Sequence, residues 1–390
     1  MQPHAVLETA KVSNPVRDLR SQGQSVWLDY IQRNLITSGE LQRLIEEDGV
    51  TGITSNPSIF EKALTSGTAY ADLLNCECST DRDAKTQYEI LAIRDIQDAA
   101  DLLRPVYEKT VRRDGYVSLE VSPYLARETA GTIQEARALW NSVDRENLMI
   151  KVPGTAEGIP AFQQLIAEGI NVNVTLLFSQ RVYRQVAEAY ITGLERFAAC
   201  GGDVSKMASV ASFFISRIDT LVDSIIASRL KSTKDRVEQE QLQSLLGKVA
   251  IANGKLTYQH YLRFFGSARW KTLAAEGAQT QRLLWASTST KNPNYRDVLY
   301  VEELIGRNTV NTVPPPTLDA FRDHGQIRPS LVEDLDSAEA TMQALAAAGI
   351  SIDEVTSKLT DDGVRLFVEA FAKLLDAVQK NTSGLKSMRN

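Results

Sequence analysis

Short apolar runs alternate with longer amphipathic segments along most of this chain. The runs are bounded by turn residues and have the length of strands buried on both faces, whereas the segments between them carry apolar residues at helical spacing. Strands that alternate with helices in this way predict a parallel sheet joined by crossover helices. The expected strands are 25–30, 49–56, 116–121, 148–153, 170–178, 207–214, 282–288 and 308–313.

Eight such strands are the number that closes a (β/α)8 barrel, so the predicted fold class is α/β with this barrel as its core. The pattern changes to helices alone after the run Pro314–Pro316, with amphipathic segments at 330–349 and 360–380. A run of prolines ends a strand and separates the two patterns. We therefore expect an N-terminal segment 1–24, a barrel 25–316 and a C-terminal helical extension 317–390 that packs on the barrel.

The composition is that of a globular protein with a sizeable core: 390 residues, 43% of them hydrophobic and 24% charged. A net charge of -6 disfavours binding to nucleic acid or to an anionic membrane, and no apolar stretch has the length of a membrane span. Three cysteines, Cys76, Cys78 and Cys200, cannot cross-link so long a chain, which indicates a reducing compartment. We expect a cytoplasmic protein in which Cys76 and Cys78 are ordinary surface thiols.

Neither metal nor nucleotide chemistry has support in the sequence. The three histidines, His4, His260 and His324, lie far apart and belong to no metal-binding or catalytic-triad motif. No Walker motif is present, and no G-x-G-x-x-G follows an expected strand. We expect no metal and no bound cofactor.

Polar residues interrupt the expected strands at one parity. In 116–121, Val117, Leu119 and Val121 alternate with Ser118 and Glu120. If the apolar parity packs on the outer helices, the polar parity points into the barrel, and its last members lie at the C-terminal rim, where such barrels hold their active sites. The rim residues predicted in this way are Asp29, Asn56, Glu120, Lys151 and Thr175.

Lys151 is the most informative of them, because a charged amine buried in a strand is costly unless it is paired or neutral. A neutral amine attacks carbonyl groups, so a Schiff base is the chemistry that this position favours. The alternative is a purely structural lysine that pairs with Glu120 or Asp29 and stabilises the barrel.

The other polar side chains have a catalytic and a structural interpretation. Glu120 and Asp29 can move the protons that Schiff-base chemistry requires. Asn56, Asn173 and Thr175 can bind a polyhydroxylated substrate, or can serve only the turns at strand ends. Four residues near the ends of the sixth and seventh strands are candidates for binding phosphate, with solvated surface groups as the alternative. These are Ser212, Arg217, Ser287 and Lys291.

Five segments together resemble transaldolase of the longer bacterial subgroup, within the class I Schiff-base aldolases. They occur in the family's order and the resemblance extends from Ser25 to Pro316. It implies a barrel of eight strands and a cofactor-free transfer of a dihydroxyacetone unit in the non-oxidative pentose phosphate pathway. The segments are LDYIQRNLITSGELQRLIEEDGVTGITSNPSIFEKAL, SLEVSPYLA, LMIKVPGT, GINVNVTLLFS and ASFFISRID.

The resemblance also implies roles for individual residues. Lys151 matches the Schiff-base nucleophile, and Glu120 would act with Thr175 through a water during carbinolamine formation and loss. Asp29 matches the aspartate that deprotonates the donor's C4 hydroxyl. The residues matching contacts to the dihydroxyacetone hydroxyls are Thr54, Asn56 and Asn173, and those matching phosphate contacts are Ser212, Arg217 and Ser287.

One position departs from the family pattern. Some relatives carry an arginine two residues after the serine that matches Ser287, where this chain has Ser289. Lys291, two residues further on, can supply the missing charge. The implied substrates are sedoheptulose 7-phosphate or fructose 6-phosphate as donor, and glyceraldehyde 3-phosphate or erythrose 4-phosphate as acceptor. A lyase acting on fructose 6-phosphate and a catalytically inactive barrel that binds sugar phosphates are the alternatives.

Overall fold

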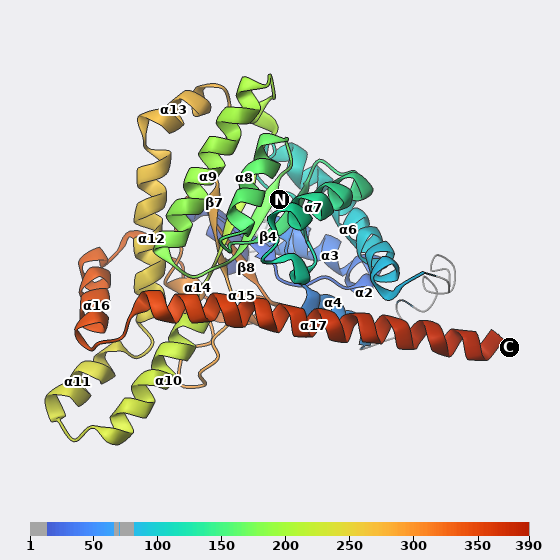
Figure 1. The fold of residues 1–390 in the computed structure, drawn as a ribbon. Helices are drawn as coiled ribbons and strands as arrows, with labels where there is room; N and C mark the ends of the chain where they lie inside the picture. Colours follow the sequence, from blue (N-terminus) through green and yellow to red (C-terminus); the bar gives the residue numbers. More distant parts are fainter. Residues whose placement is uncertain (1–13, 66–69, 71–81, 390) are drawn as a thin grey trace, which may run out of the picture.

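The computed structural model describes residues 14–65, 70 and 82–389. Eight parallel strands close into a barrel in sequence order (Figure 1), so the predicted fold class is confirmed. The strands are β1 (Gln24–Leu28), β2 (Gly52–Ile53), β3 (Tyr116–Glu120), β4 (Leu148–Pro153), β5 (Val172–Leu177), β6 (Ser209–Phe214), β7 (Arg282–Ala286) and β8 (Thr309–Val313).

Helices follow the strands and surround the barrel, as the apolar spacing of the intervening segments predicts. The helices are α1 (Pro15–Asp18), α2 (Arg33–Thr37), α3 (Glu40–Arg43), α4 (Pro57–Thr65), α6 (Ala84–Lys109), α7 (Thr129–Val143), α8 (Gly158–Ala167), α9 (Gln180–Ala199), α10 (Ser216–Ser232), α11 (Arg236–Leu245), α12 (Val249–Phe265), α13 (Ala268–Ala275), α14 (Leu299–Glu302), α15 (Pro315–His324), α16 (Leu335–Ala347) and α17 (Ile352–Arg389).

Strand β2 is much shorter than the segment 49–56 from which it was expected. Strand β2 contains Gly52 because a larger residue would not fit there. A Cβ at this position would lie 2.6 Å from the indole ring of Trp27. The chain nevertheless stays beside β1 on both sides of β2. The amide of Thr51 donates to Val26 O at 2.8 Å, and that of Thr54 donates to Leu28 O at 2.9 Å.

The N-terminal end of the barrel is closed by a buried ion pair. Arg282 of β7 lies 2.9 Å from Asp114, and both side chains are almost inaccessible to solvent. Asp114 also accepts hydrogen bonds from the hydroxyl of Ser25 at 2.7 Å and from the indole of Trp27 at 3.0 Å. These bonds satisfy both carboxylate oxygens, as a buried charge requires.

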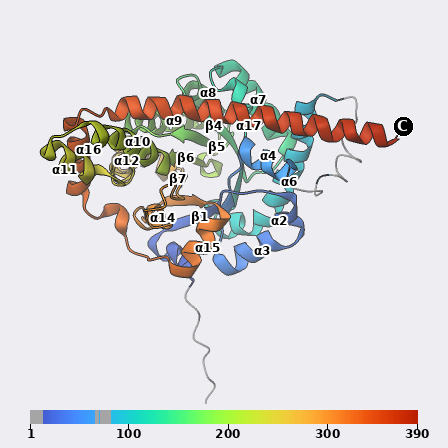
Figure 2. The same ribbon diagram turned by 90° about the horizontal axis from the view of Figure 1, so that it is seen from below.

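The C-terminal end of the barrel is crossed by the long helix α17 (Figures 1 and 2). The helix approaches β5 closely, because a Cβ on Gly363 would lie 2.8 Å from a methyl group of Leu176. Further along, the ring of Phe371 packs edge-on against Tyr88 of α6 at 5.6 Å and against Tyr124 at 5.4 Å. The predicted segment 360–380 therefore lies over the end of the barrel where active sites are built.

Helix α17 is amphipathic and packs on the protein. Within residues 14–65, 70 and 82–389, no helix combines the length and the apolar character needed to span a bilayer.

Candidate active site

A cavity of about 840 Å³ opens at the C-terminal end of the barrel. Its wall is formed by strand ends, by the loops that follow them and by Phe367 of α17. Most of the polar residues singled out from the sequence line it: Asp29, Thr54, Asn56, Lys151, Ser212, Arg217, Ser287 and Lys291. The structure thus brings together side chains from five of the eight strand ends.

Lys151 lies in β4 with its side chain 5% exposed. Its Nζ donates a hydrogen bond to the carbonyl oxygen of Ser55 at 3.1 Å and lies 3.8 Å from Oε2 of Glu120. The strand register explains this pairing, because Glu120 of β3 and Asn173 of β5 are the direct neighbours of Lys151. A buried amine with one neutral acceptor and a carboxyl group just beyond hydrogen-bonding distance can exchange a proton with that group through one intervening water.

Glu120 does not line the large cavity but lies beside Lys151. Burial raises the pKa of Glu120 to about 7, although attraction to Lys151 opposes the shift. Its Oε2 atom and the hydroxyl of Thr175 are both buried, and neither finds a hydrogen-bond partner among the described residues. A carboxyl that titrates near pH 7 can both give and take a proton at neutral pH.

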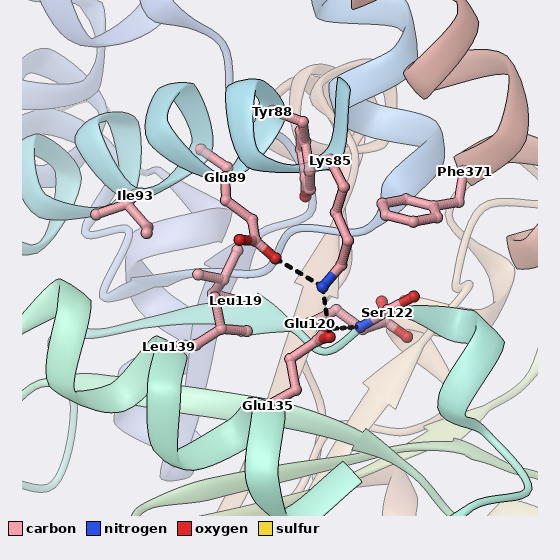
Figure 3. A pocket seen from close by; sticks show the side chains of 11 residues that line it. Lys85, Tyr88, Glu89, Ile93, Leu119, Glu120, Ser122, Glu135, Leu139 and Phe371 are labelled. Carbon is pink, nitrogen blue, oxygen red and sulfur yellow. Dashed lines mark hydrogen bonds and ion pairs between the residues drawn. The ribbon is translucent and has the colours of Figure 1, made fainter. Parts of the chain in front are cut away.

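A cluster of charges outside the barrel fixes the turn that follows Glu120 (Figure 3). Glu135 of α7 accepts a hydrogen bond from the amide of Ser122 at 2.5 Å. Lys85 of α6 in turn contacts Glu135 at 2.6 Å and Glu89 at 2.9 Å. No local pattern in the sequence indicates this support, because its members come from two helices and a turn that are distant in the chain. It anchors the residue two positions after Glu120 and so restricts where that carboxyl can lie.

Asp29 lies just beyond the end of β1 and accepts a hydrogen bond from the hydroxyl of Thr54 at 2.8 Å. The hydroxyls of Thr54 and Thr312 are 2.7 Å apart, so a chain of hydroxyls leads to the carboxylate. Burial raises the pKa of Asp29, while Lys151 and the bond from Thr54 oppose the shift. Sequence reasoning missed Thr312, although the inward parity of β8 contains it and could have revealed it.

Three of the expected substrate contacts also make internal hydrogen bonds. Asn173 donates to the hydroxyl of Ser118 at 3.1 Å and accepts from Ser212 at 2.6 Å, inside the barrel. The hydroxyl of Ser212 is therefore directed to Asn173. Asn56 accepts from the amide of Ile59 at 3.1 Å and so serves the first turn of α4. This is the turn chemistry that the sequence left open, yet the same side chain lines the cavity.

Cations gather on one part of the cavity wall. Arg217 lies in the first turn of α10 with its guanidinium 5.3 Å from the ring of Phe214. Lys291 lies on the loop after β7 and donates to the hydroxyl of Ser289 at 2.6 Å. Desolvation lowers the pKa of Lys291, and the charge of Arg217 lowers it further. Lys62 of α4 also lines this cavity, and sequence reasoning missed it because an exposed helix lysine carries no signal.

The described histidines and the described cysteine lie away from this cavity. His260 contacts Gln180 at 3.2 Å and Arg263, and His324 contacts Asp297 at 2.9 Å on the surface. The described part of the chain holds no group of three or more histidine, cysteine or acidic side chains that could bind a metal ion. Cys200 is exposed, and Cys76 and Cys78 lie outside the described residues.

Comparison with known proteins identifies relatives over nearly the whole chain. The family model for transaldolase/fructose-6-phosphate aldolase matches residues 26–378. A transaldolase of Trichodesmium erythraeum is 47% identical over 376 residues, which cover 96% of this chain and 99% of the relative. A transaldolase of Thiobacillus denitrificans is 49% identical over 362 residues, 93% of this chain and 99% of the relative. The transaldolase of Thermobifida fusca is 47% identical over 368 residues, 94% and 98% of the two chains. The chain therefore belongs to the transaldolase/fructose-6-phosphate aldolase family.

Proposed function

We propose that this chain is a transferase that moves a dihydroxyacetone unit between sugar phosphates through a Schiff base on Lys151. The donor is sedoheptulose 7-phosphate or fructose 6-phosphate, and the acceptor is glyceraldehyde 3-phosphate or erythrose 4-phosphate. The observation that carries the proposal is the buried amine of Lys151, 3.8 Å from Glu120, in a cavity that also holds Asp29. The reaction belongs to the non-oxidative pentose phosphate pathway and needs no cofactor.

The first half of the reaction forms an imine. The neutral amine of Lys151 attacks the C2 carbonyl of the donor, and the carbonyl oxygen becomes the hydroxyl of a carbinolamine. The protonated carboxyl of Glu120 gives its proton to that oxygen, then takes a proton from the nitrogen and gives it to the hydroxyl, which leaves as water. The iminium is then formed and Glu120 is left ionised. Because burial raises the pKa of Glu120 to about 7, the carboxyl can serve in both directions. Thr175 assists through a water.

The second half breaks and remakes a carbon–carbon bond. Asp29 removes the proton of the C4 hydroxyl, the C3–C4 bond breaks, and its electron pair passes to the iminium nitrogen to give an enamine. The aldose product leaves, and the enamine carbon attacks the acceptor aldehyde, whose oxygen receives the proton from Asp29. Hydrolysis then releases the ketose. The hydrogen bond from Thr54 fixes the carboxylate that makes both proton transfers.

The polar wall of the cavity fits a phosphorylated polyol. Arg217 and Lys291 supply positive charge for the phosphate, with Ser287 as a neutral donor. Thr54, Asn56 and Asn173 are proposed to hold the dihydroxyacetone hydroxyls. Ser212, whose hydroxyl donates to Asn173, is proposed to orient that amide as well as to line the cavity. A cytoplasmic location stays a prediction from the cysteine content.

The covalent step is tested by trapping. Incubation with fructose 6-phosphate and borohydride, followed by proteolysis and mass spectrometry, is expected to locate a reduced adduct on Lys151 and nowhere else. Lys255 is a matched control, because it is also buried and its Nζ donates to the carbonyl oxygen of Glu333 at 3.0 Å. An adduct on Lys255, or none on Lys151, would contradict the assignment.

Acceptor dependence separates the transferase from its alternatives. Fructose 6-phosphate should be consumed with erythrose 4-phosphate present and only slowly without it. Fast consumption without an acceptor would identify a lyase, since the three-carbon unit is then released by hydrolysis and is not transferred to an acceptor. Sugar phosphate binding without adduct or turnover would identify an inactive barrel that only binds its ligand.

A further inference from the structure

The loop 287–298, which carries Lys291, is fastened to helix α10 at two places. At its start, the amide of Ser216 donates to the carbonyl oxygen of Ser287 at 3.1 Å, and the two hydroxyls lie 3.0 Å apart. Near its end, the hydroxyl of Tyr295 donates to Oδ2 of Asp223 at 2.6 Å. Helix α10 also carries Arg217. The positions of both cations of the proposed phosphate site therefore depend on this one helix.

The second attachment is built in detail. Asp223 accepts a further hydrogen bond from the amide of Gly247 at 3.3 Å. The ring of Tyr295 packs directly on that glycine, because a Cβ there would lie 2.8 Å from Cζ of the ring. Gly247 also has a φ of +69°, which disfavours other residues. Side chains larger than hydrogen are thus excluded at Gly247 by both contact and backbone.

One turn earlier on α10, a second tyrosine makes the same kind of bond. Asp219 is 1% exposed and accepts from the hydroxyl of Tyr300 at 2.9 Å and from the amide of Ala250 at 2.7 Å. Asp219 and Asp223 are four residues apart and so lie on one face of the helix. The two tyrosine hydroxyls thus attach the end of loop 287–298 and the start of α14 to the same face of α10.

The two cations do not attract each other. The charge of Arg217 lowers the pKa of Lys291, so bringing the loop to the helix has an electrostatic cost. A phosphate dianion between them would remove that cost, whereas in its absence the attachments of the loop and the attraction of both cations to Asp29 oppose the repulsion. We propose that Tyr295 and Asp223 are positioning residues that hold Lys291 beside Arg217 for the phosphate group of the sugar. The inference rests on the proposed function.

The test is a thermodynamic cycle with Tyr295→Phe, which removes only the hydroxyl. We expect a 3- to 10-fold rise in KM for fructose 6-phosphate and a similar rise in the inhibition constant of inorganic phosphate, about the net contribution of one hydrogen bond. Turnover of unphosphorylated fructose should stay unchanged. In a Lys291→Met background, Tyr295→Phe should have no further effect on either constant, because the residue it positions is absent.

Tyr258→Phe is the matched control, because its hydroxyl donates to Arg307 O at 3.0 Å, in a bond that holds no part of loop 287–298. It should leave phosphate inhibition unchanged. Equal losses with fructose and fructose 6-phosphate in Tyr295→Phe, or additive losses in the Lys291→Met background, would show a general structural role and overturn the inference. A failure of the proposed phosphate site is a different result, namely phosphate inhibition that is unaffected by Arg217→Ala.

Discussion

The amine of Lys151 and the carboxyl of Glu120 lie 3.8 Å apart on neighbouring strands, and each side chain is 5% exposed. The distance is too long for a hydrogen bond, and the amine instead donates to the carbonyl oxygen of Ser55. The pair is held by strand register, since Glu120 and Lys151 are direct partners of β3 and β4. A fixed carboxyl that titrates close to neutral pH beside a buried amine is the arrangement that imine formation requires.

If Glu120 and Asp29 have the proposed separate roles, their neutral variants should fail at different steps. Glu120→Gln and Asp29→Asn should each lower kcat by about 10²- to 10⁴-fold, as expected for proton-transfer groups. Borohydride trapping separates them. Glu120→Gln should form the imine slowly, whereas Asp29→Asn should form it and accumulate it uncleaved. Equal trapping rates and yields in the two variants would contradict the division of roles.

The raised pKa of Glu120 also predicts a dependence of stability on pH. Its folded pKa of about 7 lies above the ordinary 4.5, so the folded state binds this proton more tightly than the unfolded state. Stability linked to the group is therefore fully present below about pH 4.5 and is lost as the pH rises to about 7. Glu120→Gln mimics the protonated form and should be more stable than the parent by about 1 to 3 kcal/mol above pH 7.

Thermal unfolding of both proteins between pH 4.5 and 8 checks this expectation. The difference in Tm should grow with pH up to about 7 and then level off. A difference that does not vary with pH would mean that Glu120 is not an ionising group of unusual pKa.

The barrel and its polar interior could be predicted because alternation along a strand is a local signal. All eight strands were expected from their apolar runs, and the inward parity of Glu120, Lys151 and Asn173 follows from their positions. The ends of the strands were less well predicted. Strand β2 has two residues where eight were expected. The fit of Gly52 against Trp27 on another strand is likewise a contact that alternation along the segment does not reveal.

Contacts between distant parts of the chain could not be predicted. The hydroxyl of Ser212 was expected at the phosphate and is directed to Asn173, a residue of another strand. The wall provided by Phe367 required knowledge of where α17 lies. Amphipathic spacing shows that a helix covers something, but it does not say which surface it covers.

The buried ion pair at the other end of the barrel should matter for stability and not for the reaction. Arg282→Met leaves Asp114 as an uncompensated buried charge and should lower the free energy of unfolding by about 3 to 5 kcal/mol. Adding Asp114→Asn should recover part of the loss, because the remaining side chain is neutral. Denaturant unfolding measures both effects. A large change in kcat for the folded single variant would show that the two ends of the barrel are coupled.

The close approach of α17 to β5 predicts that Gly363→Ala will not give the stabilisation expected from helix propensity. Glycine to alanine inside a helix ordinarily stabilises by about 0.5 to 1 kcal/mol. At Gly363 the added methyl would lie 2.8 Å from a methyl group of Leu176, so either this buried side chain or α17 has to shift, and stability should fall or stay level. Ser357→Ala, at an exposed position of the same helix, is the control and should stabilise slightly. If Gly363→Ala instead stabilises the protein by the ordinary amount, the contact with Leu176 relaxes without a cost in free energy.

Recognition of phosphate should depend more on Arg217 than on Lys291. The guanidinium lies in the first turn of α10 and over the ring of Phe214, so it offers a planar pair of donors from a rigid element. Lys291 carries a point charge at the end of a flexible side chain on a loop. Arg217→Ala should lower kcat/KM for fructose 6-phosphate by an amount that corresponds to a loss of about 2 to 4 kcal/mol in transition-state stabilisation. The corresponding loss for Lys291→Ala should be about 0.5 to 1.5 kcal/mol.

Part of the loss in Arg217→Ala should appear in kcat, because phosphate binding energy can also orient the donor's carbonyl against Lys151. The control is unphosphorylated fructose, which should react poorly with the parent protein and respond little to either substitution. Steady-state kinetics with both sugars distinguishes a loss of phosphate binding from a loss of structure at the barrel mouth. If turnover of fructose falls as steeply as that of fructose 6-phosphate in Arg217→Ala, then Arg217 stabilises the barrel mouth and does not bind phosphate. If Lys291→Ala proves the more damaging of the two, the loop and not the helix provides the main phosphate contact.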